Sequence, residues 1–126
     1  EMKRVCRDIL VLVDGVSSED IDKSLLHNRI EKMRDPSHVR IYSLSEIEEM
    51  FNEAGADITD ITHWEIPQDF EEWMDRAGTP DTQKKIIEQL MLKSLDVDRT
   101  ELQVDIKDGR LGFAYDTVIL IAQIRT

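Results

Sequence analysis

The sequence has little cysteine, glycine or proline, with one, five and three of them among 126 residues. The single cysteine, Cys6, cannot form an internal disulfide, and such a chain is typical of a reducing compartment, so we expect a cytoplasmic protein. So little glycine and proline excludes a collagen-like or low-complexity chain. The longest apolar runs, Ile9 to Val13 and Val118 to Ala122, fall far short of the roughly 20 residues that a membrane-spanning helix needs.

Positive charge is also scarce. The chain has 16 Lys and Arg against 27 Asp and Glu, a formal net charge of −11. The acidic excess is spread over both halves, so no basic surface is available to bind phosphates, and we expect neither nucleic acid nor a membrane as a partner. With 40% hydrophobic residues, the chain can bury one modest core, so residues 1–126 are predicted to form a single domain or half-domain.

Several functional motifs are absent. The five glycines form neither G-x-G-x-x-G nor G-x-x-x-x-G-K, so the sequence encodes no loop for a phosphate or a dinucleotide. The three histidines have no C-x-x-C motif beside them and no helical i,i+4 spacing to one another, so we predict no metal site. No base accompanies Cys6 in the pattern, which favours an inert, buried thiol over a nucleophile.

The hydrophobic pattern predicts an α/β fold. Ile9 to Val13 is apolar on both faces, which is typical of a strand in the middle of a parallel or mixed sheet with helices on either side. Ser43 and Glu46 can form a capping box at the start of a helix, and Asp108 and Gly109 supply the turn of a hairpin. The predicted strands are 8–13, 57–63, 101–106, 111–115 and 117–124, and the predicted helices are 18–33, 44–54, 68–77 and 80–93.

Each of these helices has a predicted apolar face, as in the first and the last of them. The first is expected to begin at Ser17 or Ser18, and the last has Thr79 as its N-cap and Pro80 at its first position. Apolar residues at helical spacing define the buried faces. They are Ile21, Leu25, Leu26, Ile30 and Met33 in the first helix, and Ile86, Ile87, Leu90 and Met91 in the last.

The segment from His27 to Arg40, which contains Arg-Asp-Pro-Ser-His-Val-Arg, carries a family resemblance. Together with Leu10 to Asp14 and His63 to Trp73, it resembles the C-terminal half of a class I S-adenosylmethionine-dependent methyltransferase. More narrowly, the chain is similar to the small-molecule branch grouped with the ubiquinone and menaquinone biosynthesis methyltransferases. The resemblance spans essentially the whole chain.

This resemblance implies a place for each element in a Rossmann-like sheet. Ile9 to Val13 would be the fifth strand, residues 57–63 the sixth, and Val118 to Ile124 the seventh, antiparallel between them. Helices 18–33 and 68–93 would cap the substrate pocket, and Glu1 to Val5 would end the helix before the fifth strand. The family holds S-adenosylmethionine on elements that would precede Glu1, so the cofactor is implied for the complete enzyme and none is expected to bind this chain alone.

Candidate site residues follow from the sheet. Ligands of open α/β sheets bind beyond the carboxyl ends of the strands, so Asp14, Gly15 and Val16, with His63 and Trp64, are predicted to border the pocket below the capping helices. The candidates for substrate binding are His27, Asn28 and His38, with Arg40 and Trp64 behind them. No residue is assigned a catalytic role.

Structural alternatives exist for some of these candidates. The segment Asp35 to His38 also fits a turn whose side chains bond to its own backbone. Trp64 also fits a core position together with Phe70 and Trp73.

Two functions fit the sequence. In the first, the chain is the substrate-side part of a methyltransferase that acts on a small molecule, inactive alone, with an N-terminal half as its partner. In the second, it is a non-catalytic binding or oligomerisation module of the same fold, in which a second copy covers the hydrophobic sheet edge.

Overall fold

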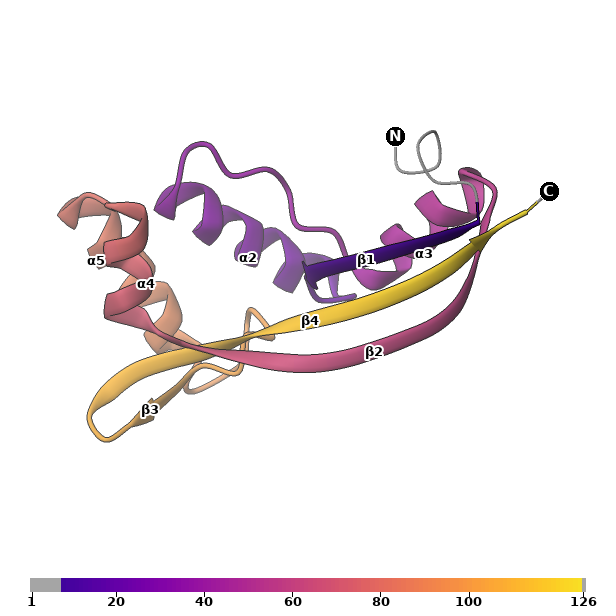
Figure 1. Ribbon diagram of the computed structural model, residues 1–126. Helices are drawn as coiled ribbons and strands as arrows, with labels where there is room; N and C mark the ends of the chain where they lie inside the picture. Colours follow the sequence, from indigo (N-terminus) through magenta and orange to yellow (C-terminus); the bar gives the residue numbers. More distant parts are fainter. Residues whose placement is uncertain (1–7, 126) are drawn as a thin grey trace.

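The computed structural model of the protein describes residues 8–125. The predictions about Cys6 and about a helix end at Glu1 to Val5 lie outside these residues. Figure 1 shows a curved sheet with helices packed along it. In chain order the elements are β1 (Ile9–Val16), α2 (Ile21–Arg34), α3 (Leu44–Glu53), β2 (Ala56–Asp69), α4 (Phe70–Ala77), α5 (Asp81–Lys93), β3 (Asp105–Lys107) and β4 (Arg110–Ile124).

Strand β4 is the centre of the sheet. It pairs antiparallel with β1 along one side and with β2 along the other, and β3 folds back on its first residues. Strands β1 and β2 therefore run parallel to each other with an antiparallel strand between them (Figure 1). This order confirms the α/β fold class and the places that the resemblance implied for the fifth, sixth and seventh strands.

The strands differ in length from the prediction. The two predicted strands at 111–115 and 117–124 are one strand, β4, and β2 continues from 63 to Asp69. Both are long because they pair with each other from one end to the other, with one irregularity between Ile58 and Asp60. Within the predicted strand 101–106 only residues 105 and 106 belong to a strand, β3, because Glu101 and Gln103 have φ of 60° and 52°, outside the extended region.

The start of α2 corrects the prediction. Asp20, not Ser17 or Ser18, is the N-cap, and its side chain accepts a hydrogen bond of 3.1 Å from the backbone N–H of Lys23. The predicted apolar face is also wrong over the first turns, since Ile21 and Leu25 are exposed. The residues that α2 buries are Ser24, His27, Ile30 and Glu31.

Helix α5 also begins differently from the prediction. Pro80 is its N-cap, and the hydroxyl of Thr79 instead donates to the backbone carbonyl of Arg34 at 2.9 Å. Ile87 and Met91 are buried as predicted. Ile86, predicted on the same face, is 46% exposed.

Local signals for caps and turns are confirmed. Ser43 and Glu46 form the capping box of α3, each accepting a hydrogen bond from the backbone N–H of the other. Gly78 ends α4 in the left-handed region with φ of 63°. Asp108 and Gly109 both have positive φ, 52° and 76°, as a two-residue hairpin turn requires.

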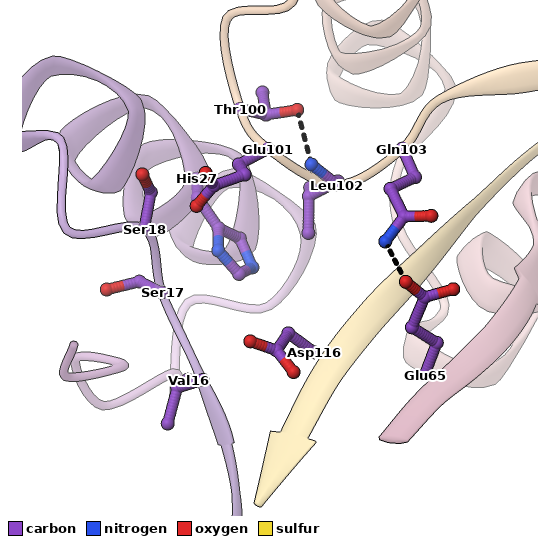
Figure 2. A pocket seen from close by; sticks show the side chains of 10 residues that line it. All are labelled: Val16, Ser17, Ser18, His27, Glu65, Thr100, Glu101, Leu102, Gln103 and Asp116. Carbon is purple, nitrogen blue, oxygen red and sulfur yellow. Dashed lines mark hydrogen bonds between the residues drawn. The ribbon is translucent and has the colours of Figure 1, made fainter. Parts of the chain in front are cut away.

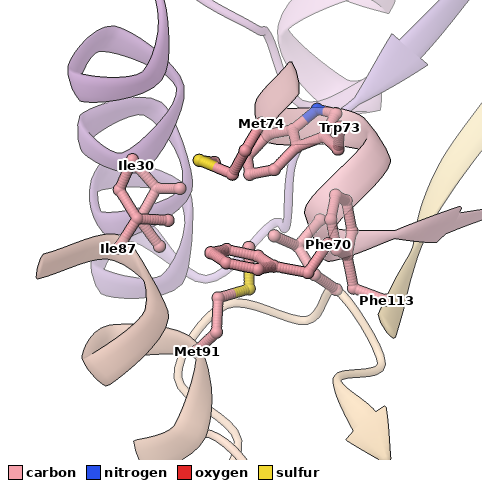
Figure 3. Close-up of a cluster of buried hydrophobic side chains, with 8 residues drawn as sticks. Ile30, Phe70, Trp73, Met74, Ile87, Met91 and Phe113 are labelled. Carbon is pink, nitrogen blue, oxygen red and sulfur yellow. The ribbon is translucent and has the colours of Figure 1, made fainter. Parts of the chain in front are cut away.

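The sheet and helices enclose two hydrophobic clusters. The first lies where α2, α4 and α5 meet the start of β4 (Figure 3), and the second lies between α3 and the rest of the sheet. On β4, Phe113 belongs to the first cluster, and Val118 and Leu120 belong to the second. Successive side chains of a strand point to opposite faces, so these odd-numbered and even-numbered positions lie on opposite faces of β4. The first cluster consists of Ile30, Phe70, Trp73, Met74, Ile87, Met91, Leu102 and Phe113.

Part of one face of the sheet is left exposed by residues 8–125. Val11 and Val13 on β1 are 53% and 58% exposed, and they pair with Ile121 and Ile119 on β4. We call these four residues the uncovered sheet face. The prediction that helices flank β1 on both sides is therefore wrong for the described residues.

No helix in the described part of the chain is both long enough and apolar enough to cross a membrane.

Replacing Ile87 by Ala tests the first cluster. The side chain of Ile87 is fully buried, so Ile87→Ala is expected to lower the free energy of unfolding by about 2 to 5 kcal/mol, measured by urea denaturation. Ile86→Ala is the matched control on the same helix, and because Ile86 is half exposed, its loss is expected to stay below about 1 kcal/mol. Equal losses for the two variants would contradict this assignment of the buried face.

Candidate functional site

A cavity of about 340 Å³ lies beyond the carboxyl end of β1 (Figure 2). Its walls come from four places: the end of β1 and the residues after it, α2, the loop before β3, and facing positions of β2 and β4. This is the end of the strand at which open α/β sheets bind ligands. The lining residues are Val16, Ser17, Ser18, His27, Glu65, Thr100, Glu101, Leu102, Gln103 and Asp116.

The loop before β3 is held in place by Asp98. One carboxylate oxygen of Asp98 accepts from the backbone N–H groups of Thr100 and Glu101, at 3.1 and 2.9 Å. The hydroxyl of Thr100 then accepts from the backbone N–H of Leu102 at 3.2 Å. These bonds fix a non-repetitive loop as a wall of the cavity.

His27 is the buried polar residue of this cavity. Its side chain is 1% exposed, and Figure 2 shows the imidazole pointing into the space between Ser17, Leu102 and Asp116. Its Nε2 lies 3.5 Å from Oε1 of Glu31 and makes no hydrogen bond with the residues from 8 to 125. Most buried polar atoms have a hydrogen-bond partner, so this nitrogen is unusual.

A network of buried polar side chains lies behind His27. The hydroxyl of Tyr115 donates to Oε1 of Glu31 at 2.5 Å and accepts from the indole N–H of Trp73 at 2.8 Å. A guanidinium nitrogen of Arg34 lies 3.8 Å from the other carboxylate oxygen of Glu31. The ring of Tyr115 stacks on His27 with 6.1 Å between centroids.

This network keeps Glu31 ionised. Burial raises the pKa of Glu31, but the contacts with His27 and Tyr115 and the charge of Arg34 outweigh burial and hold its pKa below the ordinary value. Burial, with Glu31 beside it, raises the pKa of Tyr115 above its ordinary range, so the phenol stays protonated and acts as a donor. His27 therefore faces a buried, negatively charged carboxylate.

The rest of the cavity wall is acidic. Glu65, Glu101 and Asp116 line it, and its ten lining residues include neither Lys nor Arg. Glu65 accepts a hydrogen bond from the amide of Gln103, and Asp116 lies 3.3 Å from Nδ1 of His63, which is half exposed. The charge of the cavity therefore favours a cation over an anion.

The predicted residues Asn28 and His38 hold a loop. The amide of Asn28 accepts from the backbone N–H of Ile41 at 2.7 Å and donates to the carbonyls of Ile41 and Ser24 at 3.1 and 3.0 Å. His38 contacts the same amide, with Nε2 at 3.4 Å from its oxygen. Neither lines the cavity beside β1, and a substrate role for either stays a prediction.

Arg40 and Asn28 line a second cavity of about 450 Å³, on the side of α2 that faces the start of α3. There Arg40 forms an ion pair of 2.6 Å with Glu46, and its guanidinium lies 5.1 Å from the centroid of the Tyr42 ring. Trp64 lies on β2 and is partly exposed. Neither Arg40 nor Trp64 lines the cavity that contains His27, and a substrate role for either stays a prediction.

Asp14 and Gly15 lie just before the cavity. Both are within β1, and the lining begins one residue later, at Val16. The predicted end of the strand at 13 is therefore too early, and of the predicted border residues of this strand Val16 lines the cavity, followed by Ser17 and Ser18.

Of the two structural alternatives, the turn at Asp35 to His38 is present and the core position of Trp64 is not. Asp35 accepts hydrogen bonds from the backbone N–H and the hydroxyl of Ser37, at 3.0 and 2.7 Å, so this segment is a side-chain-bonded turn. Phe70 and Trp73 are core residues, whereas Trp64 is not.

The sequence analysis missed Glu31, Tyr115 and Asp116. A signal existed for Glu31, because it lies four residues after His27 and therefore shares a helical face with it. Tyr115 and Asp116 are more than 80 residues from His27 in the chain, and only the pairing of β1 with β4 brings them near.

Comparisons with known proteins identify the fold. The uncharacterized methyltransferase YcgJ of Bacillus subtilis (strain 168) is 41% identical over 81 residues, which are 64% of this chain and 32% of YcgJ. The crystal structure of YcgJ matches 94% of this chain and 51% of its own with a TM-score of 0.83 and 28% identity. A candidate methyltransferase of Bacillus halodurans C-125, BH2331, matches 94% of this chain and 56% of its own, with the same TM-score and 25% identity. No protein-family model matches the chain.

The chain has the fold of the C-terminal part of a methyltransferase. It spans about half the length of the two solved relatives and matches about a third of the curated one. The methyltransferase resemblance is therefore confirmed, and its narrower assignment to the quinone branch stays a prediction.

S-adenosylmethionine carries an ammonium and a sulfonium as well as a carboxylate, so the acidic wall of the cavity beside β1 does not by itself exclude it. The sequence has no glycine-rich loop whose backbone N–H groups could bind it. That no cofactor binds this chain alone stays a prediction.

Removing the hydroxyl of Tyr115 tests the buried network. Tyr115→Phe leaves the indole N–H of Trp73 without its acceptor and Glu31 without a donor, so it is expected to lower the free energy of unfolding by about 1 to 3 kcal/mol. Tyr42→Phe is the matched control, because Tyr42 is partly exposed and keeps its ring against Arg40. An unchanged free energy of unfolding in Tyr115→Phe would show that the network contributes nothing to stability.

Stability should also depend on the ionisation of Glu31. Its folded-state pKa is lower than its unfolded value, so its contribution is present above the unfolded pKa of about 4.5 and is lost as the pH falls through the folded pKa. Urea denaturation between pH 7 and pH 3 should show a shallower loss below pH 4.5 for Glu31→Gln than for the unmodified chain. Glu48 is exposed, so Glu48→Gln should lose stability below pH 4.5 as steeply as the unmodified chain.

Proposed function

We propose that this chain is the acceptor-side part of an S-adenosylmethionine-dependent methyltransferase that acts on a small molecule, and that it is inactive alone. The observation that carries the proposal is the cavity beyond the carboxyl end of β1 in a methyltransferase fold. Its volume of about 340 Å³ is in the range of small-molecule sites, which are about 300 to 1,000 Å³. The cofactor would supply the methyl group from elsewhere in the complete enzyme.

The uncovered sheet face supports a partner for this chain. Val11 and Val13 are more than half exposed, whereas a Rossmann-like sheet has helices on both faces. A segment equivalent to the N-terminal half of the relatives would cover this face. The chain would then complete both its sheet and its cofactor site by the same contact.

The same face also favours a second candidate function. A second copy of the chain could cover it, which would make the chain a non-catalytic oligomerisation module. Sedimentation over a wide concentration range separates the two functions. Under the first, the chain alone stays largely monomeric at micromolar concentration, and under the second it forms a stable dimer.

Thermal unfolding with S-adenosylhomocysteine tests the first function. The chain alone is expected to melt at the same temperature with and without saturating ligand. A chimera that joins the N-terminal half of YcgJ to this chain is expected to melt several degrees higher with the ligand, because a ligand that binds the native state stabilises it. A shift for the chain alone, or none for the chimera, would contradict the proposal.

Lysines on the uncovered sheet face provide the matched control. Val11→Lys with Val13→Lys places two charges on this face and is expected to abolish the ligand-induced shift of the chimera. Leu95→Lys with Val97→Lys changes two exposed apolar residues outside the sheet and should leave the shift intact. Equal behaviour of the two double variants would show that the N-terminal half does not use this face.

A further inference from the structure

The cavity beside β1 combines two features that point to the same kind of ligand. Its wall carries the carboxylates of Glu65, Glu101 and Asp116 with no Lys or Arg among the lining residues. Its floor is the imidazole of His27, which is buried and lines the cavity, with Nε2 3.5 Å from Glu31 and without a hydrogen bond to residues 8–125. The acidic wall alone could reflect the acidity of the whole chain, but a buried histidine directed into the cavity could not.

We propose that the cavity binds the amino group of the methyl acceptor as an ammonium ion, and that His27 takes a proton from it. This inference rests on the proposed function, since it names the class of acceptor for the same site.

The carboxylates account for the choice of an amine. An ammonium ion has up to three N–H donors and a positive charge, and carboxylates are acceptors only. An alcohol would gain no charge interaction from them, and an acid would be repelled. The hydroxyls of Ser17 and Ser18 complete the lining on the side of β1.

Glu31 accounts for the choice of His27 as the base. A carboxylate beside Nε2 favours a proton on that nitrogen, which leaves the lone pair on Nδ1 for a ligand. In the proton transfer, an N–H bond of the ammonium breaks and its electron pair stays on the amine, while a new bond forms between the proton and Nδ1. The products are a neutral amine, which has the lone pair that attack on a methyl group requires, and an imidazolium that Glu31 stabilises.

Three small molecules of similar shape test which class of methyl acceptor the cavity binds. Benzylamine, benzyl alcohol and benzoate differ in charge but hardly in size, and NMR titration of the full chain at low salt reports their binding. We expect benzylamine to shift the backbone amide signals of Ser17, Ser18 and Thr100 in a saturable way, at least about tenfold more tightly than the other two probes. Tighter binding of benzyl alcohol or benzoate, or no binding at all, would overturn the proposal.

Variants that remove carboxylate charges show where benzylamine binds. Glu101→Gln with Asp116→Asn removes two carboxylates from the wall and is expected to weaken benzylamine binding by about fivefold or more. Glu48→Gln with Glu49→Gln makes the same charge change on α3, away from the cavity, and should have no such effect. Equal weakening by both pairs would mean that the chain binds the amine only through its overall charge.

A pH titration tests the role of His27. The charged and titratable groups around it are Glu31 and Arg34 on α2, Tyr115 and Asp116 on β4, Glu65 on β2 and Glu101 in the loop, with His63 of β2 3.3 Å from Asp116. Benzylamine binding and the ring signals of His27 are followed in the same samples, and binding should weaken at the pH at which those signals show that His27 has gained a proton.

This pH dependence should disappear in His27→Gln. It should remain in His38→Gln, whose ring lies outside the cavity. If His27→Gln keeps the dependence, the proton acceptor is another group and the proposal is wrong. Because a loss of binding in His27→Gln could come from misfolding, the dispersion of the backbone amide signals is compared with that of the unmodified chain in the same samples.

The two proposals fail separately. If the chimera with YcgJ binds S-adenosylhomocysteine but the cavity prefers benzyl alcohol or benzoate, the chain is the acceptor side of a methyltransferase for a different acceptor. If the cavity selects benzylamine but the chimera does not bind S-adenosylhomocysteine, the cavity binds amines without methyl transfer.

Discussion

The antiparallel pairing of β4 with both of its neighbours is the constraint on which the rest of the structure depends. It holds β1 and β2 parallel and one strand apart, so the end of β1 and the middle of β2 face the same part of β4. There β4 places Tyr115 against the ring of His27 and Asp116 in the wall of the same cavity. The cavity therefore results from strand pairing across more than 80 residues, with α2 and one loop completing it.

Much of the fold follows from short-range signals in the sequence, and the departures have a common cause. The capping box of Ser43 and Glu46 and the hairpin turn at Asp108 involve residues a few positions apart, so the sequence alone predicts them. The two predicted strands within Arg110–Ile124 were wrongly separated because β2 supports the whole length of β4, and that partner is distant in the chain. Long-range pairing overrides a local break in the pattern.

The buried face of α2 shows the same limit at the candidate site. Its apolar pattern predicted that Ile21 and Leu25 are buried, but the helix buries His27 and Glu31 in their place. Burial of a polar side chain is favourable where hydrogen bonds satisfy it, and the donor to Glu31 is Tyr115, 84 residues away. The position of Glu31 on the same helical face as His27 could be predicted from the sequence, whereas its burial against Tyr115 could not.

The buried network has a role that stability does not explain. A buried ion pair gains little net free energy over apolar side chains of the same volume, because removing its charges from water costs about as much as their attraction returns. The network of Glu31, Tyr115 and Trp73 would thus be replaceable by Leu and Phe if packing were its only role. What apolar residues could not do is place a carboxylate 3.5 Å from Nε2 of His27, the residue at the floor of the cavity, and the proposed proton transfer depends on that arrangement.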